Sequence, residues 1–250
     1  MLSFKFKKKI KKEIQTKKIR IIFSAQRGQV LQRLHAIKYA KHNIILQMDD
    51  DVDLKRNCLK HMYKTLVNTK GRNVVGAIVF DHNINDYLYK ENLSFLHLIL
   101  KNFYEGFIMG GNYIKSNMGK ITKIGYAFNL NPNSMKSDIV KVDWVNSLCL
   151  SYKKDIIKKN YFPFTGKAYC EDLINSIERN KIGINHLIPK NARFSIPIEI
   201  NRNNLNHKLN NFFNEMRVRK FILDKISGNL INFYLFIIFE FIRRAIKNVL

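Results

Sequence analysis

The 250-residue sequence has few cysteines, few prolines and few acidic residues. Its three cysteines, Cys58, Cys149 and Cys170, are too few and too scattered for a disulfide framework or a zinc site, which favours a reducing compartment such as the cytosol. Only 4 prolines and 11 glycines argue against a fibrous or low-complexity chain. With 46% hydrophobic residues, the chain can bury a core, and its length suits one α/β domain with appendages.

Basic residues outnumber acidic ones: the chain has 44 Lys and Arg and 19 Asp and Glu, which gives a formal net charge of +25. Such an excess implies a polyanionic partner, which can be nucleic acid, an anionic membrane surface or a phosphorylated substrate. Charge alone does not choose among them. We do not expect nucleic acid, because the sequence contains no recognised nucleic-acid-binding motif and no aromatic and basic register typical of strand-binding folds.

Long hydrophobic runs are also missing, and the two ends of the chain are unusual in other ways. Residues 1–18 form a basic arm interleaved with apolar residues, and their apolar stretch is too short and interrupted for a signal peptide. The pattern predicts an arm that binds the membrane surface, and the alternative is a solvated basic tail. Residues 230–239 are apolar but shorter than the roughly 20 residues of a membrane span. Within a C-terminal helical segment, 201–250, this run predicts either an interfacial helix or a helix packed on the protein's own core. We expect peripheral attachment to the inner face of the cell membrane.

Between the ends, the hydrophobic pattern alternates between strand and helix. Residues 19–23, 43–48 and 74–80 read as strands, and helical spacing follows Gly28 and again covers residues 59–66. This order predicts an α/β fold with a Rossmann-like, mostly parallel sheet flanked by helices. The apolar strand 43–48 is expected to be covered on both faces.

Three adjacent carboxylates, Asp49, Asp50 and Asp51, follow that strand directly. Ligands of open α/β sheets bind at the carboxyl ends of strands, and three neighbouring negative charges call for a counter-ion. Mg²⁺ or Mn²⁺ suits carboxylates combined with substrate phosphates, as a nucleotide-sugar supplies. The alternative is an Asp-rich turn that caps a helix beginning near Leu54. No role is assigned to Asp53, and the seven histidines show no metal-ligand spacing.

Two blocks of sequence carry a family resemblance. The first runs from Gly28-Gln29-Val30-Leu31-Gln32-Arg33 to Met48-Asp49-Asp50-Asp51-Val52, and the second from Val142-Asp143-Trp144 through Glu171-Asp172-Leu173 to Gly183. In order and spacing they resemble the Asp-x-Asp and Glu-Asp regions of family 2 glycosyltransferases. The resemblance implies a GT-A fold over residues 19–200 and inverting sugar transfer from a nucleotide-diphosphate donor to a glycan or lipid-linked acceptor, in surface polysaccharide or lipopolysaccharide synthesis.

The resemblance also implies roles for individual residues. Asp51 would hold the metal, and Asp49 would bind the metal or the ribose; Arg33 and Asp50 would contact the donor. Asp172 would be the general base that accepts the proton of the acceptor hydroxyl. Alternatives remain, because Arg33 can be an ordinary exposed helical residue and Asp172 an ordinary carboxylate at a helix N-terminus.

Three further side chains and one missing unit complete the expectations. Trp144 can stack on an acceptor sugar or pack in the core, and Arg217 and Arg219 can reach a diphosphate or lipid phosphate. Family members begin with a strand–helix–strand unit that grips the nucleotide base, and we expect this domain to lack it. That departure keeps a second hypothesis open, a truncated, non-catalytic and membrane-associated accessory member of the same fold.

Overall fold

The computed structural model describes residues 21–25, 28–81, 86–87, 99, 101–111, 118–157, 159, 161–164, 167–196 and 205–249. The expected basic arm, 1–18, lies outside these ranges, as do the first two residues of the strand expected at 19–23. The described part of that strand, residues 21–23, is not a strand. Phe23 is 84% exposed there, and without a neighbouring strand or a buried face an apolar run has nothing to hold it extended.

The described elements alternate strands with helices along most of the chain. The strands are β1 (Ile44–Met48), β2 (Asp53–Leu54), β3 (Asn73–Gly76), β4 (Ile78–Asp81), β5 (Asp86–Tyr87), β6 (Ile139–Val142), β7 (Cys149–Lys153), β8 (Asn185–Pro189) and β9 (Arg193–Ile196). The helices are α2 (Gln29–Lys38), α3 (Cys58–Asn68), α5 (Glu171–Lys181), α6 (Leu205–Lys225) and α7 (Leu230–Val249), with two short turns, η1 (Tyr104–Ile108) and η2 (Pro132–Ser134). The α/β class predicted from the sequence is confirmed.

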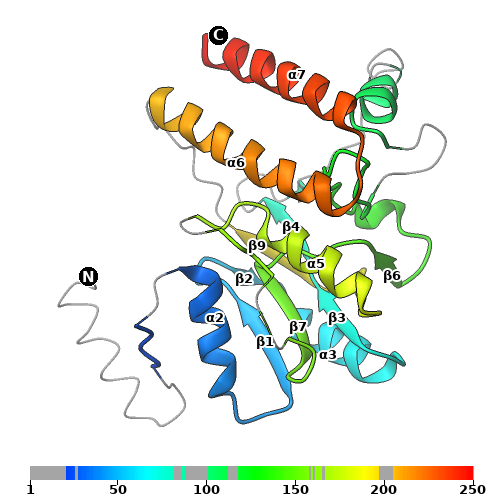
Figure 1. Ribbon diagram of the computed structural model, residues 1–250. Coiled ribbons are helices and arrows are strands. Elements are labelled where there is room, and N and C mark those ends of the chain that lie inside the picture. Colours follow the sequence, from blue (N-terminus) through cyan, green and yellow to red (C-terminus); the bar gives the residue numbers. More distant parts are fainter. Residues whose placement is uncertain are drawn as a thin grey trace.

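The larger sheet has the strand order β1-β7-β3-β8-β6 (Figure 1). Strands β1, β3 and β8 run in one direction, as the strand–helix–strand pattern predicts, but β7 lies between β1 and β3 and is antiparallel to both. Strand β6 is antiparallel to β8, so among the described strands of this sheet only β3 and β8 pair in parallel. The pairing is therefore mixed, because a strand from much later in the chain separates the two that are consecutive in the pattern.

A second sheet, ordered β2-β9-β4-β5, begins where the strand expected at 74–80 divides. The chain leaves the first sheet after Gly76, which pairs with Leu150, and enters the second at Ile78, which pairs with Arg193. A Cβ on Gly76 would lie 2.8 Å from a methyl carbon of Val145, so only glycine lets the chain pass this closely. One continuous apolar run thus supplies strands to two sheets.

Strand β1 forms one edge of the larger sheet, and the expectation that it is covered on both faces is wrong. Leu46 and Met48 are exposed, while Ile44 and Ile45 pack against the core clusters. A groove of about 440 Å³ runs beside the strand, between it and α2. No described strand pairs with the outer edge of β1, so no side chains of a further strand cover Leu46 and Met48 from that side.

The C-terminal helices α6 and α7 lie side by side, with α7 farther from the sheets (Figure 1). One face of α7 packs inward through Phe233 and Phe236, which join a buried cluster with Phe212 of α6. The predicted C-terminal helical segment is therefore packed on the protein along one face. No helix in the described part of the chain is long and apolar enough to cross a membrane.

Candidate active site

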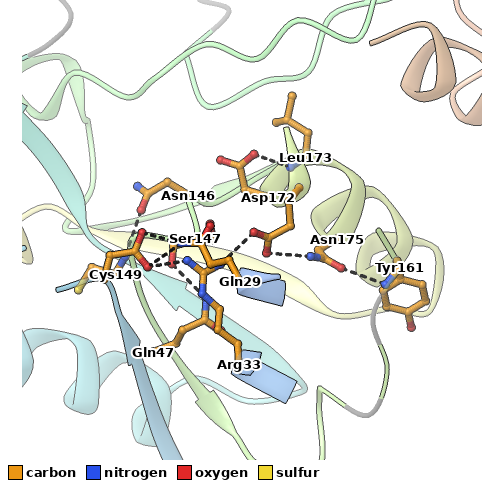
Figure 2. A network of polar contacts seen from close by, with 12 residues as sticks. Gln29, Arg33, Gln47, Asn146, Ser147, Cys149, Tyr161, Asp172, Leu173 and Asn175 are labelled. Atoms are coloured by element: carbon orange, nitrogen blue, oxygen red, sulfur yellow. Dashed lines mark hydrogen bonds and ion pairs between the residues drawn. The ribbon is translucent and has the colours of Figure 1, made fainter. Parts of the chain in front are cut away.

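Three elements that are distant in sequence bring the candidate residues together at one end of the larger sheet. Asp49 follows the last residue of β1, Arg33 lies in the middle of α2, and Glu171 and Asp172 form the first turn of α5. Helix α2 begins after Gly28, whose positive φ of 114° turns the chain into the helix. Figure 2 shows the resulting network of polar contacts.

Arg33 connects the two blocks of the family resemblance. One guanidinium nitrogen, Nη2, lies 2.5 Å from Oδ1 of Asp49, and the other, Nη1, lies 2.9 Å from Oε2 of Glu171. All three side chains are largely buried, and Gln29 Nε2 also donates to Asp49, at 3.3 Å from Oδ2. The alternative of an ordinary exposed Arg33 is wrong, since this residue bridges the carboxylates of β1 and α5.

Glu171 is the site residue that the sequence did not single out. Its Oε1 accepts a hydrogen bond from Asn175 Nδ2 at 3.2 Å, and Asn175 Oδ1 in turn accepts from the backbone N–H of Tyr161 at 3.4 Å. Burial raises the pKa of the Glu171 carboxyl, while Arg33 and then Arg179 oppose that rise. No spacing in the sequence links Glu171 with Arg33, because the contact depends on how α2 and α5 pack.

Asp172 lies next to this network but makes different contacts. Its Oδ1 accepts the backbone N–H of Leu173 at 2.9 Å, so the carboxylate does sit at a helix N-terminus, as the alternative reading expected. Burial and then the nearby Glu171 raise its pKa to about 6. A carboxylate with this pKa is ionised near neutral pH and is more basic than an ordinary Asp, which suits a general base. Its catalytic role stays a prediction.

The Asp49-Asp50-Asp51 turn leaves two carboxylates exposed. Asp50 and Asp51 face solvent, whereas Asp49 is held by Arg33 and Gln29. Helix α3 begins at Cys58 after Asn57, with β2 before it, so the Asp turn does not cap a helix near Leu54. Within the described ranges, no group of three or more His, Cys, Asp or Glu side chains could hold a metal ion.

The remaining candidates have partners of their own. Trp144 is half-buried, and its indole Nε1–H donates to the backbone carbonyl of Phe128 at 3.0 Å. Arg219 is largely buried and donates to Glu215 and to the carbonyl of Gly125, with its guanidinium 5.1 Å from the ring centre of Tyr126. Arg219 therefore cannot reach a phosphate as expected, because its donors are directed inward. Arg217 is exposed, over the ring of Phe164.

This α/β fold, with carboxylates following a strand and a second acidic turn beside them, is of the kind that binds ligands at strand ends. A family model described as "Glycosyl transferase family 2" matches residues 6–124. The match confirms the resemblance over this segment, which contains Arg33 and the Asp turn. Asp172 lies beyond the matched residues. No curated protein matches the chain.

This match supports glycosyl transfer as the general activity. Family 2 enzymes generally use nucleotide-sugar donors and divalent metals. The carboxylate oxygens of Asp49 and of the exposed Asp51 are hard ligands of the type that Mg²⁺ or Mn²⁺ prefers, and substrate phosphates usually complete such a site. In their chemistry these two carboxylates suit the implied metal, and Asp49, which is paired with Arg33, would have to change partner to bind it.

Proposed function

We propose that this protein transfers a sugar, with inversion, from a nucleotide-diphosphate donor to a glycan or lipid-linked acceptor at the inner face of the cell membrane. Surface polysaccharide or lipopolysaccharide synthesis is the process that the family resemblance suggests. The observation that carries the proposal is the Arg33 bridge, which joins Asp49 to Glu171 and so sets the donor-side and acceptor-side motifs next to each other.

In this proposal Asp172 accepts the proton of the acceptor hydroxyl. The hydroxyl oxygen forms a bond to the anomeric carbon while the bond from that carbon to the diphosphate oxygen breaks, so the nucleoside diphosphate leaves with the bonding electrons. A carboxylate whose pKa is about 6 gains a proton readily in the transition state, and general bases of this kind contribute about 10²–10⁴-fold in rate.

Arg33, Asp49, Asp50 and Asp51 form the donor side of the proposed site. A divalent metal held by Asp49 and Asp51 would offset the negative charge that develops on the leaving diphosphate. Asp50 and Arg33 would contact the donor. Because Arg33 is bonded to Asp49 and Glu171 at once, it can keep Glu171 in place while Asp49 changes partner.

Isothermal titration of the chain with UDP and then GDP, each with and without Mn²⁺, tests the donor site. We expect metal-dependent binding in the wild type, its loss in Asp51→Asn, and its retention in Asp53→Asn, which removes a neighbouring exposed carboxylate on β2 of the second sheet. Absence of binding from the folded wild-type chain, or equal loss in both variants, would overturn the proposed donor site.

A non-catalytic accessory role is the second candidate, and one observation favours it. Asp49, the residue expected to share the metal, already accepts hydrogen bonds from Arg33 and Gln29. An accessory member would keep these contacts as structure and bind neither donor nor metal. The titration therefore separates the two functions, since only the transferase requires metal-dependent nucleotide binding.

A further inference from the structure

The outward face of α7 is apolar along most of its length. Between residues 230 and 242, every exposed side chain is hydrophobic or aromatic: Leu230, Ile231, Tyr234, Ile238, Phe239, Phe241 and Ile242. Ile231 alone is 74% exposed. The opposite face carries the buried Phe233, Phe236 and Glu240. A helix on the surface of a globular protein normally turns polar residues outward, so this face requires a partner.

A second segment extends the same apolar surface. Phe103 and Phe107 are both about half exposed, and their rings stack with centres 5.2 Å apart; Ile99, one turn earlier, is also exposed. This segment is fixed to α7, because the amide of Asn232 bonds the carbonyl of Phe107 and the Tyr104 ring meets that of Phe239 at 6.1 Å. We call Ile99, Phe103, Phe107 and the exposed residues of α7 the apolar surface.

The apolar surface lies on the outside of the protein, on the helix farther from the sheets. Helix α7 is the outer of the two C-terminal helices, with α6 between it and the sheets, and η1 lies beside the start of α7 (Figure 1). The contacts between η1 and α7 include the hydroxyl of Tyr104, 3.5 Å from Glu240. Two helical segments are thus held rigidly in one outward-facing patch, which a partner can contact without rearrangement of the fold.

We infer that the apolar surface inserts into the headgroup region of an anionic membrane. A second copy of the chain would bring a further formal charge of +25 against the first, which opposes association, whereas anionic lipid attracts that charge. Exposed aromatic and aliphatic side chains gathered on one helix face are typical of interfacial binding. Arg243 follows Ile242 at the end of this apolar stretch; its side chain is 61% exposed and paired with Glu240, and it adds positive charge at the border.

This inference deepens the proposed location at the inner membrane face and rests on it, but it requires neither donor nor metal. It identifies which part of the protein meets the lipid. A lipid-linked acceptor would then approach from the side of α7, and the enzyme would meet it at the membrane surface. Membrane binding and nucleotide binding can be measured separately, so that failure of one does not imply failure of the other.

The test is flotation of the full chain with vesicles of phosphatidylcholine alone and with vesicles containing equal parts of phosphatidylcholine and phosphatidylglycerol. The triple variant Ile231→Ser, Ile238→Ser, Phe241→Ser removes the centre of the apolar surface. The control, Leu59→Ser, Tyr63→Ser, Val67→Ser, removes a similarly exposed apolar stripe from α3. All six positions are exposed, so both variants should fold, which circular dichroism and thermal melting check.

We expect wild type and the α3 variant to float with the anionic vesicles. The α7 variant should partition onto these vesicles at least about tenfold less than wild type, because each of the three replaced side chains would bury several apolar carbon groups in the lipid. Nucleotide binding should be the same in all three. Equal binding by the α7 variant, equal loss in the α3 variant, or no binding by wild type would overturn the inference. The inference would also be overturned if wild type bound no vesicles but self-associated with rising concentration, and only the α7 variant abolished this association. The partner of the apolar surface would then be a second copy of the chain.

Discussion

Arg33 and Glu171 are 138 positions apart in the chain, yet the guanidinium of the first donates to the carboxylate of the second at 2.9 Å. The same guanidinium holds Asp49 at 2.5 Å. One side chain on α2 therefore fixes both the turn after β1 and the start of α5. A planar group with several donors in fixed directions can serve two carboxylates at once, which an ammonium group does poorly.

Substitution of Arg33 should therefore cost stability as well as activity. Arg33→Met leaves the buried Glu171 carboxylate without its ion-pair partner, and breaking a buried pair in this way costs about 3–5 kcal/mol. Arg33→Lys should recover only part of the loss, because one ammonium cannot replace both contacts. Denaturant unfolding at neutral pH measures the effect. If the double variant Arg33→Met, Glu171→Met is no more stable than Arg33→Met, the pairing argument fails.

Asp172 should control the pH dependence of sugar transfer. Its pKa is raised to about 6, so the fraction of active base, and with it the rate, should rise through about pH 6 and level off above it. Asp172→Asn should lower kcat by about 10²–10⁴-fold and leave nucleotide binding unchanged. The exposed Asp138→Asn serves as the control. A rate profile that keeps its inflection in Asp172→Asn would assign it to another group.

The raised pKa of Asp172 also affects how the stability of the fold changes with pH. The change is opposite in sign to the one that a salt-bridged Asp produces. Because the folded-state pKa lies above the unfolded value, the folded protein is favoured while Asp172 is protonated, and that advantage is lost as the pH rises from about 4 through about 6. Asp172→Asn, which stays neutral, should be more stable than wild type above about pH 7 and equal to it below about pH 4. Thermal melting across this range measures the difference, and a less stable variant at every pH would contradict it.

The sequence predicted the elements well where the hydrophobic period is local. Helices α2 and α3 and strand β1 follow from apolar spacing, and their bounds agree with the predicted ranges within a few residues. The position of β7 between β1 and β3 could not be predicted, since Ile45 pairs with Tyr152 far along the chain. The division of the strand at Gly76 had a local signal, the glycine itself, that the continuous apolar run obscured.

The candidate site was predictable to a similar extent. Asp49 and Arg33 came from a motif whose residues are close in sequence, and they do meet in the structure. Glu171 entered only as half of a motif whose other member, Asp172, was assigned the chemistry. Its bridge to Arg33 depends on the packing of α5 against α2, and no pattern in one sequence records that. The inward direction of Arg219 could not be predicted for the same reason. Its pairing with Glu215, four residues earlier, is just as common on exposed helix faces, and its contact with Gly125 depends on packing.

Arg179, next to this network, should be dispensable for stability. The side chain is buried on α5, and its Nε has no hydrogen-bond partner among the described residues. Burial lowers the pKa of the guanidinium, because Tyr152 and Glu171 offset only part of the cost of burying its charge, while Glu171 has its own ion-pair partner in Arg33. Arg179→Met, similar in length and without charge, should be neutral or stabilise the protein by about 1–2 kcal/mol in denaturant unfolding. A loss of similar size would instead show that Arg179 binds a buried anion or water.

The open edge of β1 should control how the chain behaves at high concentration. Leu46 and Met48 are exposed on a strand whose outer edge has no described partner, and such edges pair readily with other chains. A single Leu46→Lys places a charge at the edge without disturbing a packed residue, so it should raise the concentration at which aggregation begins while unfolding is unchanged. Light scattering on heating measures this, with Leu59→Lys on α3 as the control for added charge. Equal protection by both variants would mean that net charge, and not the strand edge, sets aggregation, because Leu59 lies on a helix that offers no unpaired backbone.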